Sequence, residues 1–150
     1  LPAPSPPVGL LYNRALDSAR MAELYRSADC FVLPTRGEGW GMPILEAMAC
    51  GLPAIATDWS GPTAFINREN AYPLPIRGLV PADGGGAYGQ GAQWAEPDED
   101  ALVELLRRVA RAPDERLAIG RRAANDAMRW EWRNAVDAVA SRLDVINQGD

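Results

Sequence analysis

Residues 28–62 read ADCFVLPTRGEGWGMPILEAMACGLPAIATDWSGP, and this stretch alone outlines a fold. Two short apolar runs, 30–34 and 53–57, predict buried strands because each is brief and is bounded by turn-forming residues. The segment between them predicts a helix, since Pro43 suits a first helical turn and Gly51 suits the left-handed residue that follows a helix. A strand, a helix and a second strand in this order predict a βαβ unit with a parallel sheet.

Strand and helix signals continue on both sides of this stretch. The helix inside it is expected over 42–50, and the run 30–34 is expected as the central strand. Further elements follow from apolar spacing and capping residues: a strand at 8–12, a helix from Asp17 or Ser18 to about Ala28, a short helix at 62–66 and a strand at 71–74.

The second half of the chain changes character. Its glycines and prolines predict one long loop over 75–97, and helices are then expected to begin at Asp98, Pro113 and Trp132, the last one running to Ile146. The predicted fold class is therefore α/β, a Rossmann-like parallel sheet flanked by helices, with a helical C-terminal segment.

Composition favours one domain in a reducing compartment. A chain of 150 residues with 47% hydrophobic content can bury enough surface for a single domain. No apolar run approaches the ~20 residues that a membrane span requires, so no transmembrane segment is expected. Both cysteines, Cys30 and Cys50, lie among apolar residues, which favours free buried thiols over a disulfide and fits a cytoplasmic protein.

The basic residues exclude several function classes. The chain contains no histidine and no lysine, so all fifteen basic residues are arginines. This removes Ser-His-Asp and Cys-His mechanisms, His-ligated metals, Schiff-base lysines and a phosphate-loop lysine. The net charge is -5 and no basic stripe is evident, which argues against nucleic-acid binding. The arginines of 107–122 alternate with acids, so we expect a solvated helix face; a peripheral membrane contact is the alternative.

A candidate site follows from the expected sheet. Ligands of open parallel sheets bind at the carboxyl ends of the strands, and the loops 13–18, 35–41 and 58–61 are expected there. Glu38 lies in the glycine-rich middle loop, and Glu46 is expected in the first turn of the next helix, leaning back toward the same cavity. Two carboxylates facing one site suit the binding of sugar hydroxyls.

Structural roles remain the alternatives for both acids. A glutamate near a helix N-terminus gains ~0.3–1 kcal/mol from the helix dipole without any ligand, and Glu38 fits an ordinary exposed loop acid. A glycosidase-like acid pair is disfavoured, because the field at a helix N-terminus lowers a carboxyl pKa and so opposes a protonated general acid.

The same residues resemble a known family. The quoted stretch, with Glu38 and Glu46 forming an E-x7-E motif, the sequence EAMACG at 46–51 and a strand ending in Thr57-Asp58, is similar to retaining family-four glycosyltransferases of the GT-B fold. Residues 94–97 and the segment from Trp132 add to the resemblance, which extends over about 8–146.

The resemblance implies roles for particular residues. Glu38 would contact the transferred sugar as the catalytic-site acid, and Glu46 would bind the ribose hydroxyls of a UDP-, GDP- or ADP-sugar. The remaining substrate-binding positions would be the backbone amides around Gly39, Trp40, Gly41 and Met42, with Asn13 and Arg14 beside the base. For Trp40, packing against the sheet is the alternative to sugar stacking. The nucleotide sugar would be a substrate; no cofactor and no metal are implied.

The chain departs from the family pattern in two respects. The Arg and Lys pair that clamps the diphosphate in similar enzymes and their separate acceptor domain have no counterpart in residues 1–150, so the chain would be a partial donor-binding domain with weak or undetectable transfer of its own. Arg36 or Arg14 would compensate only in part. The alternative is a catalytically inactive nucleotide-sugar-binding or assembly module, which would pair as a homodimer or with a missing N-terminal half.

Overall fold

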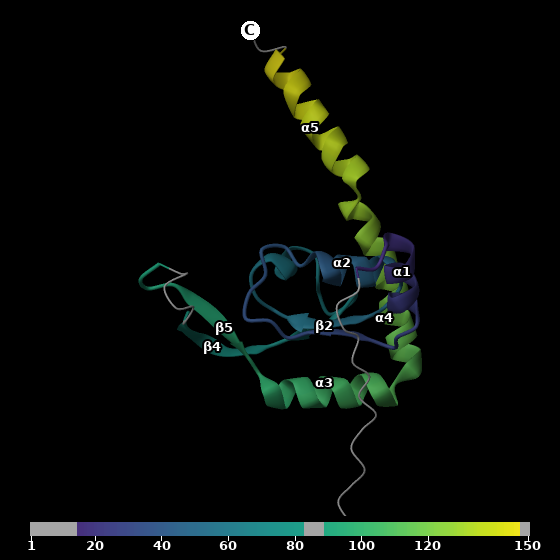
Figure 1. Ribbon diagram of the computed structural model, residues 1–150, viewed down its shortest axis with the longest axis vertical. Helices are drawn as coiled ribbons and strands as arrows, with labels where there is room; N and C mark the ends of the chain where they lie inside the picture. The colour runs from purple at the N-terminus through teal and green to yellow at the C-terminus, as the bar shows by residue number, and fades with distance from the viewer. Residues whose placement is uncertain (1–14, 83–88, 148–150) are drawn as a thin grey trace, which may run out of the picture.

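The computed structural model describes residues 15–82 and 89–147 and has the predicted α/β architecture (Figure 1). A parallel sheet of three described strands has the order β1 (Phe31–Leu33), β2 (Ala54–Thr57) and β3 (Tyr72–Leu74). Among these strands β2 is the central one and is fully buried, whereas β1 is only partly buried. In the described sheet β1 lies at an edge, and the expectation that 30–34 forms a central strand of the whole sheet stays a prediction. The strand predicted at 8–12 lies outside the described residues.

The helices follow the capping residues of the sequence. They are α1 (Ser18–Arg26), α2 (Met42–Ala49), α3 (Glu99–Arg111), α4 (Pro113–Ala127) and α5 (Trp132–Asn147), with short 3-10 turns η1 (Gly61–Ala64) and η2 (Met128–Trp130). Asp17 and Asp98 cap α1 and α3, because each carboxylate accepts hydrogen bonds from backbone N–H groups of the first turn. Gly51 has φ 77° after α2, as predicted.

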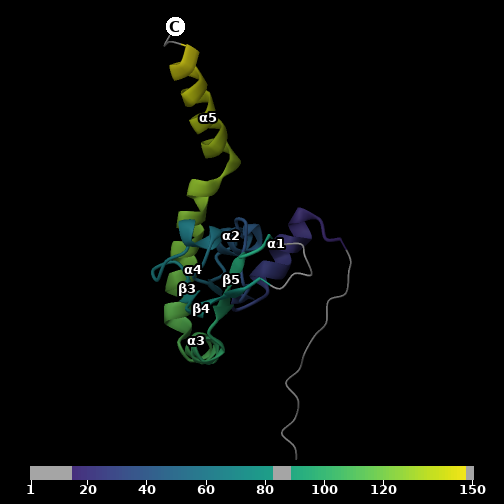
Figure 2. The same cartoon turned by 90° about the vertical axis from the view of Figure 1, so that its left-hand side faces the viewer.

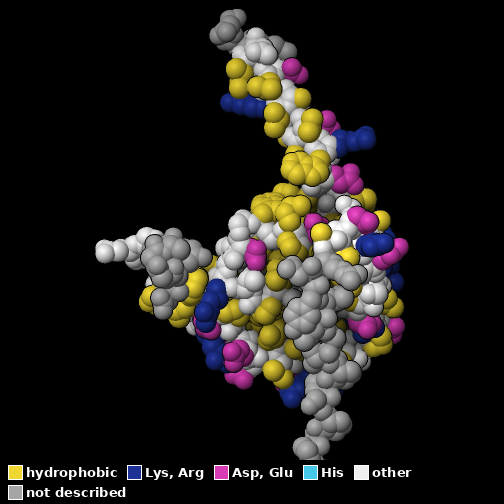
Figure 3. All heavy atoms as spheres, in the orientation of Figure 1, with side chains coloured by type: hydrophobic (Ala, Val, Ile, Leu, Met, Phe, Trp, Pro, Cys, Tyr) yellow, Lys and Arg dark blue, Asp and Glu magenta, His cyan; other side chains and the backbone are white. Residues whose placement is uncertain are grey.

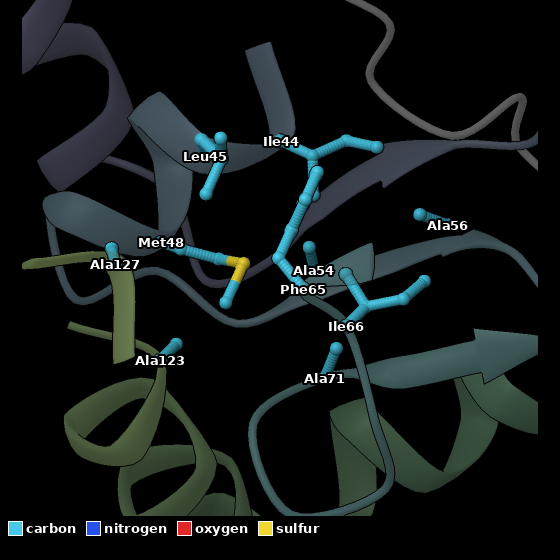
Figure 4. Close-up of a cluster of buried hydrophobic side chains, with 10 residues drawn as sticks. All are labelled: Ile44, Leu45, Met48, Ala54, Ala56, Phe65, Ile66, Ala71, Ala123 and Ala127. Atoms are coloured by element: carbon cyan, nitrogen blue, oxygen red, sulfur yellow. The ribbon is translucent and has the colours of Figure 1, made fainter. Parts of the chain in front are cut away.

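Two helices cover opposite faces of the parallel sheet. The alternation of side chains along β2 turns Ala54 and Ala56 toward α2 and Ile55 toward α3. Figure 4 shows the first of these cores, in which Ile44 and Met48 of α2 lie over the sheet. The second core unites strand residues with the α3 and α4 side chains Leu102, Leu105, Val109 and Ile119. Packing against the sheet therefore fixes the position of α2, the helix that carries Glu46.

Helix α4 approaches the end of α2 at a glycine. Gly120 is buried, and a Cβ atom added there would overlap the carbonyl oxygen of Gly51 and lie 3.3 Å from Cδ of Pro53. Backbone oxygen cannot move as a flexible side chain can, so only glycine permits this contact. Because the helical middle is otherwise a poor place for glycine, Gly120 sets how closely α4 supports α2.

We expect Gly120→Ala to lower the free energy of unfolding by about 1–2 kcal/mol, since the overlap outweighs the ~1 kcal/mol of helix propensity gained. Thermal and urea unfolding measure the change. Ala118→Gly, at an exposed position of α4, is the control and should lose ~1 kcal/mol through propensity alone. A Gly120→Ala variant that is more stable than the wild type would contradict the close approach.

The prediction of one long loop over 75–97 is wrong, because two strands form within this range. Strands β4 (Ile76–Pro81) and β5 (Gln93–Pro97) form an antiparallel hairpin with an irregularity between Ile76 and Gly78. Burial alternates along β4, the pattern of a half-exposed strand, but the surrounding glycines and prolines hid this signal. The hairpin reaches the site, because Ala95 N–H donates a hydrogen bond of 3.0 Å to the carbonyl oxygen of Arg36.

Helix α5 extends away from the body of the molecule (Figures 1 and 2). None of its residues is buried, and its apolar side chains form part of the hydrophobic surface visible in Figure 3. The exposed set includes Trp132, Val136, Val139, Leu143 and Ile146. Within residues 15–82 and 89–147, no helix is long and apolar enough to cross a membrane.

Candidate functional site

A serine joins the two described loops at the carboxyl edge of the sheet. The hydroxyl of Ser60 donates to the carbonyl oxygen of Glu38 at 2.6 Å and accepts from the Glu38 N–H at 3.1 Å. Gly61 N–H donates to the same carbonyl oxygen at 3.2 Å. The loops 35–41 and 58–61 therefore lie side by side, as their positions after neighbouring strands predict, and the backbone of Glu38 is held from the opposite loop.

The same contact requires glycine and an unusual backbone. A Cβ atom at Gly61 would lie 2.5 Å from the oxygen of Gly39 and 2.7 Å from Cα of Trp40. Ser60 has φ 57° and ψ -142°, and within the described ranges it is the only residue other than glycine with a positive φ. Such a conformation costs about 1–3 kcal/mol and persists where surrounding contacts enforce it. Ser60 was not among the predicted site residues, and the available signal was a Ser-Gly-Pro sequence shortly after the predicted strand 53–57.

Two substitutions separate the hydroxyl of Ser60 from its backbone strain. Both Ser60→Ala and Ser60→Gly remove the hydrogen bonds to Glu38, but only glycine adopts φ 57° readily. We expect Ser60→Ala to lower the free energy of unfolding by about 1 kcal/mol. The free energy of unfolding of Ser60→Gly should be ~1 kcal/mol higher than that of Ser60→Ala, because glycine relieves the backbone strain. Urea denaturation measures both. Equal stabilities of the two variants would contradict the strain at this residue.

Glu46 lies farther along its helix than expected. It is the fifth residue of α2, so it stands in the second turn, and the expectation of a first-turn position is wrong. The N-terminal dipole, whose effect is confined to about the first turn, therefore has little influence on it. Glu46 is exposed between the buried residues Leu45 and Ala47, and its Oε2 atom accepts a hydrogen bond of 3.0 Å from the hydroxyl of Tyr25.

Glu38 and Glu46 open on different hollows of the described chain. The hollow at Glu46 has a volume of about 440 Å³ between α1 and α2; Leu16, Met21, Ala22 and Tyr25 are among its lining residues. A second hollow of about 440 Å³ joins Glu38 to Arg36, Trp59, Ser60 and Trp94. The described residues thus do not show the single cleft that the sequence predicts, although both acids are accessible from outside.

The predicted side-chain ligands other than Glu38 and Glu46 have different surroundings. Trp40 packs against Phe65 and Trp130, with ring centroids 5.5 and 5.0 Å away, rather than against the sheet. Arg36 forms an ion pair of 2.8 Å with Glu96 and lies over the ring of Trp94, so its charge already has a partner. Asn13 and Arg14 lie outside the described residues.

Backbone amides at the start of α2 differ in whether they are free to bind a ligand. Gly41 precedes the helix with φ 91° and is buried, and Met42, the first helical residue, is exposed. The N–H of Ile44 donates to the carbonyl oxygen of Gly41 at 2.9 Å and is therefore not free for a ligand. A ligand at this end of the helix would therefore depend on the backbone from Gly39 to Met42.

Burial raises the pKa of two groups, Tyr25, which lines the Glu46 hollow, and Cys30, which packs against the core that contains Ile55. Loss of solvent, followed by the hydrogen bond and the negative charge of Glu46, raises the pKa of Tyr25 to about 12. Burial likewise raises the pKa of the Cys30 thiol to about 11. Both cysteines are free, as predicted, but they are half-buried rather than buried. At neutral pH the Tyr25 hydroxyl is a donor and Cys30 is a poor nucleophile.

Comparison with known proteins decides the family. Residues 10–84, half of the chain, match the family described as glycosyl transferases group 1. The chain belongs to this family. Sequence relatives include a D-inositol 3-phosphate glycosyltransferase of Saccharomonospora viridis, 30% identical over 85% of the chain, and one of Xylanimonas cellulosilytica, 31% identical over 93%. A sulfoquinovosyl transferase of Arabidopsis thaliana is 26% identical over 86% of the chain.

A solved structure supports the fold of this group 1 glycosyltransferase chain. Sucrose-phosphate synthase from Thermosynechococcus elongatus superposes with a TM-score of 0.68 and 20% identity, covering 90% of this chain and 29% of the synthase. The chain covers 25, 28 and 22% of the two bacterial relatives and the plant relative, respectively. It therefore spans about a quarter of the length of the proteins that it matches.

Proposed function

We propose that this chain is the donor-binding part of a glycosyltransferase that transfers a sugar from a nucleotide sugar with retention of anomeric configuration. Family membership supports glycosyl transfer as the reaction class. The observation that carries the proposal within the molecule is the exposed Glu46 carboxylate at the mouth of a partly apolar hollow. An ionised carboxylate accepts hydrogen bonds only, so it suits a vicinal diol such as that of ribose.

The surroundings of Glu46 favour a nucleoside over a free sugar. Leu16, Met21 and Ala22 supply apolar contact on one side of the hollow, while Glu46 is its acidic residue. In a ligand with a flat apolar ring and a neighbouring diol, the ring would contact the apolar residues and the diol would donate hydrogen bonds to Glu46. We therefore assign the ribose hydroxyls of a UDP-, GDP- or ADP-sugar to Glu46.

The transferred sugar is assigned to Glu38. Ser60 and Gly61 fix the backbone of this residue, and the glycines beside it allow a ligand to approach the main chain closely. A diphosphate between the two acids would be repelled by both, and Arg36 is paired with Glu96 rather than free to neutralise it. Glu38 would thus serve a donor whose phosphates are neutralised mainly by other groups; no metal or cofactor is part of this proposal.

Replacing each acid should separate the two parts of the donor. Glu46→Gln should weaken binding of UDP, GDP or ADP, whichever the chain binds, by about tenfold, because it removes the charge that strengthens hydrogen bonds from the diol. Glu38→Gln should leave nucleoside diphosphate binding within about twofold and weaken only the nucleotide sugar. Isothermal titration calorimetry measures both affinities.

Glu104→Gln is the matched control, since Glu104 is an exposed acid on α3 that pairs with Arg107. It should change neither affinity. Unchanged nucleotide binding in Glu46→Gln would remove Glu46 from the donor site, and equal losses for nucleotide and nucleotide sugar in Glu38→Gln would remove the assignment of Glu38 to the sugar.

Transfer by this chain alone should be weak or undetectable. Stabilisation of a departing diphosphate contributes several kcal/mol to enzyme catalysis, and Arg36, which lines the Glu38 hollow, is already paired with Glu96. The measurement is release of nucleoside diphosphate from a nucleotide sugar in the presence of an acceptor extract. Robust turnover by the purified chain would contradict this expectation.

A second candidate is an assembly module that binds a nucleotide sugar without catalysis. The exposed apolar side chains of α5, with Trp132 81% exposed, favour association with another protein surface. Light scattering at micromolar concentration tests this reading. A dimer that binds nucleotide but shows no transfer when joined to the remainder of a family enzyme would support it, whereas a stable monomer would contradict it.

A further inference from the structure

Tyr25 connects the core of the molecule to the Glu46 hollow. Only 7% of the residue is exposed, and it packs with Ala47 and Leu52 in a small core between α1 and α2. Its ring also meets that of Phe31 edge to face, with centroids 5.7 Å apart. The orientation of the ring is therefore set by packing on several sides, and its hydroxyl has little freedom to move.

The Tyr25 hydroxyl contacts one oxygen of Glu46. It donates to Oε2 at 3.0 Å, from a residue 21 positions earlier in the chain. Glu46 itself is exposed, so without this contact its side chain would sample several rotamers in solvent. A rigid donor thus holds an otherwise mobile carboxylate, and Tyr25 also lines the same hollow.

We propose that Tyr25 is a positioning residue that orients the Glu46 carboxylate for a nucleoside diol, holding Oε2 so that Oε1 faces the ligand. This inference rests on the proposed function, because it assumes that Glu46 meets the nucleotide. Pre-ordering the acceptor lowers the entropy lost on binding, which strengthens affinity without any direct contact between Tyr25 and the ligand.

A purely structural role for Tyr25 predicts different behaviour. If only the ring mattered, Phe would replace Tyr without consequence for the ligand, because the packing against Ala47, Leu52 and Phe31 would be kept. The chain also offers a matched tyrosine. Tyr72 is 3% exposed, and its hydroxyl has no hydrogen-bond partner among the described residues.

The first experiment compares Tyr25→Phe with Tyr72→Phe in the whole chain, titrated with UDP, GDP and ADP by calorimetry. We expect Tyr25→Phe to weaken the nucleotide that binds best by about three- to tenfold, and Tyr72→Phe to leave it unchanged. Thermal unfolding of each variant shows whether the fold is intact. Wild-type affinity in a folded Tyr25→Phe variant would overturn the inference.

A double-mutant cycle distinguishes this inference from the proposed function. In a Glu46→Ala background, Tyr25→Phe should have no further effect on nucleotide affinity, because its effect passes through Glu46. An equal loss in both backgrounds would show that Tyr25 acts independently and would overturn the inference. If Glu46→Ala weakens binding but Tyr25→Phe does not, the proposed function stands and the inference fails; if Glu46→Ala has no effect, the proposed role of Glu46 fails.

A ligand-free measurement tests the contact itself. Burial and Glu46 together hold the pKa of Tyr25 near 12, so removing the acid should lower it. Following the Cζ carbon of Tyr25 by NMR, we expect the hydroxyl to begin losing its proton at lower pH in Glu46→Ala than in wild type, with Tyr72 unchanged. Identical titration of Tyr25 in the two proteins would overturn the inference even where no nucleotide binds.

Discussion

Burial of α2 on the sheet is the constraint on which the candidate site depends. Ile44, Leu45, Ala47 and Met48 are all buried, and Glu46 is the exposed residue among them. Because helical side chains follow a 3.6-residue period, burial of these four residues turns the side chain of Glu46 away from the sheet and toward solvent. The close approach at Gly120 then fixes α2 from α4, so the acid stands on a rigid support rather than on a loop.

The glycine-rich loop is constrained by a different mechanism. Glu38 lies outside any helix or strand, and its backbone is ordered by hydrogen bonds from Ser60 and Gly61 of the neighbouring loop. Each of these three hydrogen bonds contributes roughly 0.5–1.5 kcal/mol, so together they offset the ~1–3 kcal/mol that the positive φ of Ser60 costs. The hydrogen bonds that order the Glu38 backbone therefore also hold Ser60 in its strained conformation.

Local signals predicted most of the fold, and non-local contacts account for what was missed. Asp17, Pro43 and Gly51 act within a few residues of their own positions, so the helix limits were readable from sequence. The hairpin β4–β5 was missed because its glycines and prolines resemble a loop until the two strands pair. The contacts of Ser60 with Glu38 and of Tyr25 with Glu46 join residues 22 and 21 positions apart, which no spacing rule within one chain segment encodes.

Charge balance links the site to the remainder of a family enzyme. Glu38 and Glu46 each open on a hollow, and the arginine beside Glu38 is occupied by Glu96. A nucleoside diphosphate placed near both acids would bring like charges together, and the described arginine at the Glu38 hollow is already paired, so further cations would strengthen its binding. The chain spans about a quarter of its relatives, so the proposed division of labour is that this part selects the nucleoside and sugar while cations elsewhere neutralise the phosphates. Under that division, substitutions of Glu46 and Glu38 alter recognition of the nucleoside and the sugar, whereas stabilisation of the departing diphosphate depends on cations in another part of the protein.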